Sequence, residues 1–236
     1  NPLQARRFAE ANGTRAKTDE VDARMLAQMG AAFDLAPQKP VSKQALILKD
    51  LHVARAALIK ERTRLRNRAQ VQEVAVLKRQ TKARLAQVER QIVELDAEIA
   101  ALIEAEPGTA RSRDILCSIP GVGTVTAASM LTLLPEIGTL ERKRVASLAG
   151  LAPITRQSGQ WNGKAFISGG RKALRDALYM PALVAIRYNP DLKARYDALR
   201  EAGKPAKVAI VAVMRKLIEL ANALVKADRM WTEKAA

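Results

Sequence analysis

The chain has 236 residues, of which 48% are hydrophobic, so it can bury a large core and whole-chain disorder is excluded. Forty Lys and Arg against 24 Asp and Glu leave a formal net charge of +16, which favours a polyanionic partner, DNA or RNA first. No apolar run reaches the roughly 18 to 20 residues that span a bilayer, and no signal peptide opens the chain. We therefore expect a cytoplasmic, nucleoid-associated protein with no membrane contact. Cys117 is the single cysteine and His52 the single histidine, so an internal disulfide and a zinc finger are excluded.

The first predicted unit covers residues 1–41. A helix is expected to open near Thr18 or Asp19, and a loop with two prolines closes the unit. Asp19 and Asp22 would project from one face of this helix, where two carboxylates can share a divalent cation. Two acids on a helix are usually only solvated, and a two-metal site needs further carboxylates, none of which is obvious nearby.

The second predicted unit covers residues 42–106, where Gly and Pro are absent and helix formers dominate. In its second half, apolar residues alternate spacings of three and four, as in an a/d seam: Leu85, Val88, Ile92, Leu95, Ile99 and Leu102. In its first half, leucines recur every seven residues at Leu51, Leu58 and Leu65. The pattern predicts a long coiled-coil helical hairpin that packs on itself or on a second subunit.

Charge is divided unevenly along this predicted hairpin. Residues 52–84 carry ten Lys or Arg and two Glu, whereas residues 85–106 carry one Arg and six acids. Such a run is commonly a solvated helix face, but the charge of the whole chain favours contact with nucleic acid.

The third predicted unit covers residues 107–236 and is helical, with a Gly-rich loop region in the middle. Helices are expected before Pro120 and at about 125–134, 142–149, 172–187 and 204–227. Residues 151–155 and 164–167 could pair as a short ribbon. The fold class is therefore mainly α.

The segment from Ile119 to Gly123, Ile-Pro-Gly-Val-Gly, has the form of a helix-hairpin-helix turn. Gly121 and Gly123 would let the backbone approach a phosphate, and the free N–H groups of the next helix could receive the anion. Such contacts hold the nucleic-acid backbone without reading its sequence. The alternative is a plain turn between two helices.

Two serines lie in Gly-rich, cationic surroundings, Ser158 before Gly159 and Ser168 before Gly169. A serine that attacks DNA needs an exposed hydroxyl and cations that hold the phosphate. The candidate cations are Arg156, Lys164, Arg171, Lys172 and Arg175. From chemistry alone, the plainer alternative is favoured: Ser158 shapes a turn and Ser168 caps a helix starting near Gly170, because no evident base accompanies either.

Together these residues resemble the insertion-sequence transposases with a four-acid (DEDD) RuvC-like domain, which include the Piv DNA invertases and the bridge-RNA-guided recombinases. The resemblance covers nearly the whole chain and is carried by motifs in the family's order. They are residues 13–23, 119–121, 149–153, Ser158-Gly159, 169–171 and Leu174-Arg175. It implies a remnant of a RuvC-like (RNase H-like α/β) domain over 1–41, the coiled coil over 42–106, and a transposase domain with the helix-hairpin-helix turn over 107–236.

The resemblance also implies residue roles. Asp19 and Asp22 would be the third and fourth acids of a Mg²⁺ site, and Ser158 would form the covalent link to a DNA end. Ser158 is preferred to Ser168 because members with a similar Gly-Gly-Arg turn can carry Gln just before it. The partners implied are DNA, a structured guide RNA in the guided branch, and a second copy of the chain through the coiled coil. Pairing of dimers into tetramers is left open.

One departure from the family pattern is large. A RuvC-like domain needs a strand-rich core with an Asp and a Glu, and nothing in this sequence supplies it. Since the sequence also begins without Met, we expect an N-terminal truncation and a chain inactive in DNA cleavage. The rival hypothesis is a non-catalytic, dimeric DNA- or RNA-binding remnant or repressor. A structural coiled-coil scaffold would explain residues 42–106 but not the basic Gly-rich loops.

Overall fold

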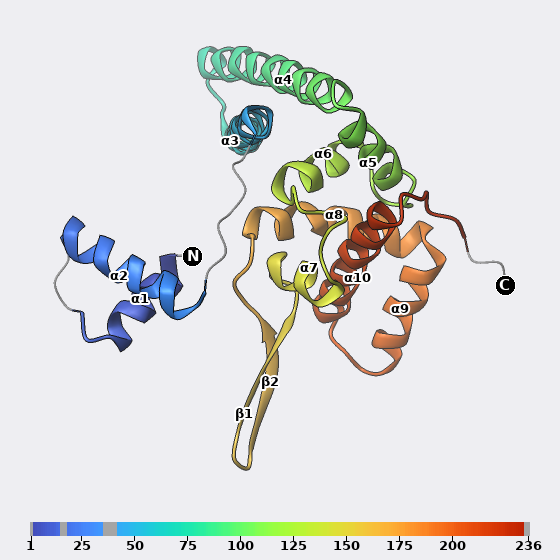
Figure 1. Ribbon diagram of the computed structural model, residues 1–236. Coiled ribbons are helices and arrows are strands. Elements are labelled where there is room, and N and C mark those ends of the chain that lie inside the picture. The colour runs from blue at the N-terminus through green and yellow to red at the C-terminus, as the bar shows by residue number, and fades with distance from the viewer. Residues whose placement is uncertain (1, 15–17, 35–41, 234–236) are drawn as a thin grey trace. The chain divides into compact units, whose positions relative to one another are not determined.

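The computed structural model describes residues 2–14, 18–34 and 42–233, which are mainly helical with one small two-stranded sheet, as predicted (Figure 1). The chain divides into two compact units, Asn1–Val41 and Ser42–Ala236. No helix of the described ranges is both long and apolar enough to cross a bilayer.

The first unit is a pair of helices, α1 (Pro2–Ala11) and α2 (Asp19–Ala32). The Thr18 hydroxyl accepts a hydrogen bond from the Val21 backbone N–H at 3.3 Å, which caps the first turn of α2. The predicted helix start at Thr18 and Asp19 is confirmed. Phe8 and Phe33 meet edge to face with ring centroids 5.7 Å apart and join the two helices.

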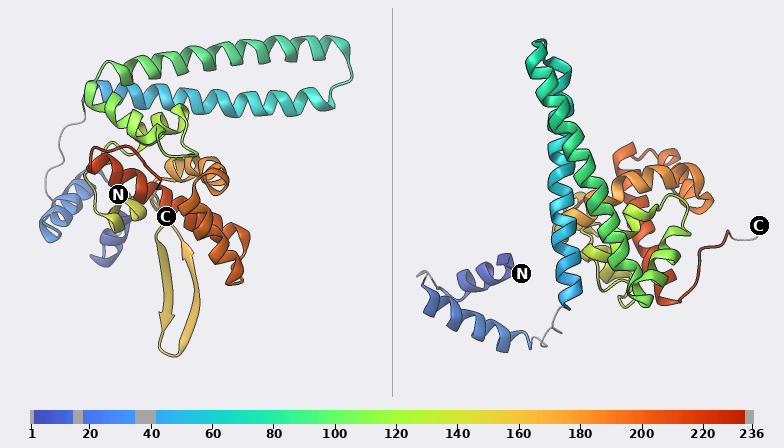
Figure 2. Two further views of the ribbon diagram at one scale, coloured as in Figure 1. Left: turned by 90° about the vertical axis from the view of Figure 1, so that its right-hand side faces the viewer. Right: turned by 90° about the horizontal axis from the view of Figure 1, so that it is seen from above.

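Residues 42–106 form a helical hairpin, with α3 (Lys43–Val71) and α4 (Ala75–Glu104) packed along each other (Figure 2). Leu65, Val88 and Ile92 are buried between the helices, and three partly buried neighbours pack against them: Leu58, Ile59 and Leu85. The hairpin thus buries this part of its predicted seams on itself. Dimerisation through a coiled coil stays a prediction.

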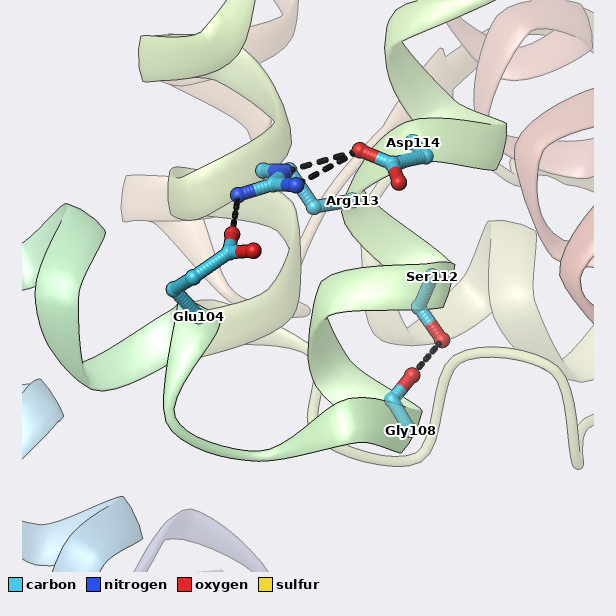
Figure 3. A network of polar contacts seen from close by, with 5 residues as sticks. All are labelled: Glu104, Gly108, Ser112, Arg113 and Asp114. Atoms are coloured by element: carbon cyan, nitrogen blue, oxygen red, sulfur yellow. Dashed lines mark hydrogen bonds and ion pairs between the residues drawn. The ribbon is translucent and has the colours of Figure 1, made fainter.

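The root of the hairpin shares the core of the helical domain that follows. Ile99 and Ile103 of α4 are buried in that core, with Leu48 and Leu51 of α3 packed against it. Arg113 of α5 (Pro107–Cys117) pairs with Glu104 at the end of α4 and donates to Asp114 at 2.7 Å (Figure 3). The end of the hairpin is therefore joined to the next helix by an ion pair as well as by the shared core.

The helical domain packs around the last long helix. Its helices after α5 are α6 (Thr124–Leu133), α7 (Arg142–Leu148), α8 (Lys172–Tyr188), α9 (Pro190–Glu201) and α10 (Ala206–Lys226). One face of α10 is buried along its whole length, and it contacts α5, α7, α8 and α9. Buried Asn222 accepts from the Gly138 N–H and donates to the Leu140 carbonyl, so the loop between α6 and α7 is held against α10.

Most of these helices lie where the sequence places them, but α9 is not predicted. Asn189 caps it by accepting from the Leu192 N–H at 3.1 Å, and Pro190 occupies its first turn. Pro is favoured at the first position of a helix, so the Asn-Pro pair is compatible with a helix start as well as with a turn.

A β-ribbon interrupts the helical domain between α7 and α8. β1 (Pro153–Ser158) pairs antiparallel with β2 (Trp161–Ile167), and the ribbon projects from the helices (Figure 1). It is longer than predicted. Ser158 pairs with Trp161 across a two-residue turn, in which Gly159 has the positive φ of +55° that such hairpin turns require.

Candidate nucleic-acid interface

The base of the ribbon is held by two glycines whose backbones lie against each other. Gly150, after α7, and Gly170, before α8, both have positive φ, +66° and +64°. A Cβ at Gly170 would lie 2.2 Å from the Gly150 nitrogen, and one at Gly150 would lie 2.3 Å from the Gly169 oxygen. Glycine is therefore required at both positions, and the two ends of the ribbon are fixed together.

Two of the predicted cations strengthen this base. Arg171 donates to both carboxylate oxygens of Glu136, at 2.6 and 2.7 Å, and to the Leu133 carbonyl at 2.9 Å. Arg175 donates to the carbonyls of Gly169 and Gly150, at 2.8 and 3.3 Å. Both guanidinium groups are thus used inside the fold, and their contact with nucleic acid stays a prediction.

The Arg171–Glu136 pair has a consequence for stability at low pH. The hydrogen bonds from Arg171 hold the pKa of Glu136 below its usual value, more than burial raises it. A depressed folded-state pKa stabilises the fold above the unfolded value of about 4.3, and this contribution is lost as pH falls through the folded value. The free energy of unfolding should therefore decline below about pH 4.3.

Glu136→Gln tests this dependence by chemical denaturation at several pH values. The variant should lose at most about 1 kcal/mol at neutral pH, because the carboxylate is 40% exposed. Its difference from the parent should shrink as the solution is acidified. A difference that stays constant down to the lowest pH would contradict the assignment.

Lys172 lies on the exposed surface at the start of α8. Its ammonium group pairs with Asp176 one turn later at 2.5 Å. An exposed pair of this kind is weak, so the lysine can exchange its carboxylate for a phosphate. Its predicted contact with nucleic acid is not tested by this position.

The two candidate serines differ in their surroundings. Ser158 lies at the tip of the ribbon, and all of β1 is exposed. Ser168 is exposed in the loop before α8, but it does not cap that helix, whose N-cap residue is Arg171 without a side-chain cap. The interpretation of Ser168 as a helix cap is therefore wrong. Within the described residues, neither serine hydroxyl has a hydrogen-bond partner.

Arg156 and Lys164 lie on the same ribbon as Ser158. The guanidinium carbon of Arg156 lies 4.3 Å from the centroid of the Phe166 ring. Lys164 is exposed and makes no ion pair or hydrogen bond with any residue that the structure describes. The ribbon that carries the serine thus also carries two cations without a carboxylate partner among the described residues.

The predicted phosphate-binding turn joins α5 to α6. Gly121 has φ +100°, and a Cβ there would lie 2.7 Å from the Ala185 nitrogen of α8, so this glycine serves close packing. A Cβ at Gly123 would meet no atom within 4 Å, and Gly123 is the exposed N-cap residue of α6. No side chain caps α6, so its first N–H groups are open to an anion.

Asp19 and Asp22 lie in the first turn of α2, in the first unit. Asp19 is exposed and Asp22 half-buried. No group of three or more His, Cys, Asp or Glu side chains that could hold a metal ion occurs among the residues described. The two aspartates supply oxygen ligands, but they form only part of a metal site.

The structure thus brings Ser158, Arg156 and Lys164 together on one ribbon and leaves the two aspartates in a separate unit. Two residues that contact the candidate cations were not predicted: Phe166 lies against Arg156, and Glu136 pairs with Arg171. The alternation of side chains along the strands predicts that Phe166 has a neighbour on the opposite strand. It does not identify this neighbour as Arg156, because the register shifts between Ile154 and Arg156.

Comparison with protein families gives two matches. The model described as the transposase IS116/IS110/IS902 family matches residues 113–197, which hold the turn, the ribbon and α8. A second transposase model, for DEDD transposases of the IS110 type, matches residues 1–88, which hold α2 and the first helix of the hairpin.

Comparison with curated proteins finds relatives over almost the whole chain. The pilin gene-inverting protein of Moraxella lacunata is 33% identical over 243 residues, covering 99% of this chain and 74% of the relative. That of Moraxella bovis matches equally well. An uncharacterized 43.6 kDa protein of insertion element IS110 from Streptomyces coelicolor is 34% identical over 145 residues, which is 60% of this chain and 35% of that protein. The chain belongs to the IS116/IS110/IS902 transposase family.

Proposed function

We propose that this chain holds and joins DNA strands as part of a recombinase that carries out transposition or site-specific inversion. The observation that supports this most directly is the place of Ser158, exposed at the tip of a projecting ribbon that also carries Arg156 and Lys164, two cations without an ion-pair partner among the described residues. The family match and the gene-inverting relatives support the reaction class.

In this proposal, the Ser158 oxygen attacks a DNA phosphorus atom. One phosphoester bond forms to serine as one bond to a DNA oxygen breaks, and that oxygen leaves with a proton. The energy of the broken bond is kept in the serine–DNA link, so strands can be rejoined without an external energy source. No described residue hydrogen-bonds to the Ser158 hydroxyl, so in this proposal the proton acceptor would have to come from another part of the recombinase–DNA complex.

The turn between α5 and α6 would act as a helix-hairpin-helix element that holds the DNA backbone. The open N–H groups at the start of α6 and the bare Cα of Gly123 are suited to close approach of a phosphate. Gly121 would contribute indirectly, by fixing the turn against α8. Strand joining itself is assigned to Ser158.

Mg²⁺ is the cation proposed for the acidic site, with Asp19 and Asp22 as two of its ligands. Hard cations prefer carboxylate oxygens, which these residues offer from one helix turn. The fit is incomplete, because the described residues supply no third ligand beside them. No step of the reaction is therefore derived through the metal.

The basic half of the hairpin is proposed to contact nucleic acid, a structured guide RNA if the protein belongs to the guided branch. Residues 52–84 carry ten cations, and two of them pair with acids of α4: Arg55 with Asp96 and Arg66 with Glu89. Among the other cations there, Arg62 is partly buried, and the remaining ones are exposed and available to phosphates. A dimer through the hairpin is proposed from the resemblance.

A non-catalytic binding protein is the second candidate. The lack of a base beside Ser158 and of a third metal ligand in the described ranges favours it for this chain taken alone. We expect no DNA cleavage by the 236-residue chain with Mg²⁺. Magnesium-dependent recombination by this polypeptide would contradict that expectation.

Contact between the ribbon and DNA can be tested by salt-dependent binding of a short mixed-sequence duplex. Arg156→Ala and Lys164→Ala should each weaken binding and lower the slope of log K against log salt by about 0.9, the value for one lost phosphate contact. Arg6→Ala is the charge-matched control, because it removes one cation from α1 and not from the ribbon. Unchanged slopes for both ribbon variants would refute contact between the ribbon and DNA.

A further inference from the structure

The Arg156 side chain lies over an aromatic ring of the opposite strand. Its guanidinium carbon lies 4.3 Å from the ring centroid of Phe166, within the range of a cation–π contact. In the register, Arg156 faces Gly163, which has no side chain, and Phe166 faces Ile154. The guanidinium group therefore has room to lie diagonally over the ring, toward the base of the ribbon.

Stacking on the ring leaves the donors of Arg156 available. A carboxylate partner would occupy the N–H groups and cancel the charge, but Arg156 has neither an ion pair nor a hydrogen bond among the described residues. A ring covers only one face of the guanidinium plane, and the N–H groups at its edge can grip a phosphate with two hydrogen bonds. Lys164 has no aromatic ring against it among the described residues.

The direction of the stack decides which phosphate Arg156 can reach. Arg156 and Ser158 are two residues apart on one strand, so their side chains share a face about 7 Å apart. The guanidinium group leans away from Ser158, since Phe166 lies nearer the base of the ribbon. A phosphate held by Arg156 therefore lies close to the one that Ser158 reaches but is a different one, because about 7 Å spans two of the roughly 3.4 Å axial steps between the phosphates of one DNA strand.

We propose that Phe166 is a positioning residue, which holds Arg156 as the anchor for a phosphate flanking the attacked one. This inference rests on the proposed function in its identification of the ribbon as the DNA-facing element. Phe166 contacts no reacting atom in this proposal and acts only through Arg156. Its ring pre-orders a flexible side chain, which lowers the entropy lost when the phosphate binds.

The test is a double-mutant cycle on duplex DNA binding, measured with the 236-residue chain in the absence of Mg²⁺. Phe166→Leu keeps an apolar residue in the strand and removes the ring, and should weaken binding about two- to five-fold, the range of an exposed cation–π contact. In the Arg156→Ala background the same change should have almost no effect. Phe166→Tyr and Phe166→Trp should retain binding, since both keep a ring.

Lys164→Ala provides the matched background. Phe166→Leu should weaken binding by the same factor with or without Lys164, because this cation has no contact with the ring. If Phe166→Leu no longer weakened binding in either the Arg156→Ala or the Lys164→Ala background, the ring would merely maintain the ribbon. That result would overturn the proposal. An effect that is undiminished without Arg156, or absent in the parent, would overturn it as well.

The outcome of this double-mutant cycle can be distinguished from the outcome of the test of Ser158. Binding without Mg²⁺ reports the anchor and needs no strand joining. If Ser158 proved dispensable while the Phe166–Arg156 coupling persisted, the proposed chemistry would fail and the anchor would stand. If Ser158 were essential and the coupling absent, only the anchor would fail.

Discussion

Ser158→Ala in an otherwise complete recombinase is expected to abolish strand joining, because alanine offers no oxygen to form the link to DNA. Loss of a covalent nucleophile removes the reaction path itself, so joining should fall by several orders of magnitude, to about the background rate. Recombination of a plasmid that carries both DNA sites, followed by sequencing of the junctions, gives the measurement.

Ser168→Ala is the matched control for this prediction. Ser168 is also exposed and lies in a Gly-rich, cationic segment, but at the base of the ribbon, and it is not the N-cap residue of α8. Its loss should leave joining close to the parent level. A covalent DNA adduct trapped on Ser158, and absent from the alanine variant, would support the assignment directly. If only the Ser168 variant lost joining, the choice of nucleophile would be wrong.

Gly170→Ala is expected to cost about 2 to 5 kcal/mol in the free energy of unfolding, from a strained backbone and a steric clash together. The residue has φ +64°, and the new Cβ would lie 2.2 Å from the backbone nitrogen of Gly150. Neither atom belongs to a flexible side chain, so the two loops must separate. The base of the ribbon would open, and DNA binding through the ribbon would weaken with it.

Substitutions at two other glycines separate the cost of backbone strain from the cost of the steric clash. Gly169→Ala carries the same backbone strain, with φ +70°, but meets no atom within 4 Å, so it should cost about 1 kcal/mol. Gly108→Ala meets no atom either and has an ordinary helical conformation, so it should change stability by less than about 1 kcal/mol. Denaturant unfolding of the three variants should rank them in this order. A Gly170 variant as stable as the Gly108 variant would refute the close contact.

Local sequence patterns predicted the helices well where a capping residue or the absence of Gly and Pro marked their extent. Thr18 before two acids predicted the start of α2, and the long stretch without Gly or Pro predicted the hairpin. The same rules missed α9, since Asn189-Pro190 is compatible with both a turn and a helix start. Packing of α9 against α8 and α10 decides between them.

The roles of the candidate cations could not be separated by sequence. Arg156, Arg171 and Arg175 look alike in a basic, Gly-rich segment. In the fold, Arg171 binds a carboxylate 35 positions earlier, and Arg175 binds the carbonyls of two loops. Arg156 lies on a ring and keeps its N–H groups available.

The sequence by itself determined the helical class, the basic character of the chain and the resemblance that led to its family, because these depend on composition and on short-range order. Tertiary structure alone decided that Ser158 lies at the tip of a projecting ribbon and that Gly150 and Gly170 close its base. It also decided which arginines stay available for phosphate. Each of these outcomes depends on strand register or on contacts between distant loops, and such contacts form only when the whole domain packs.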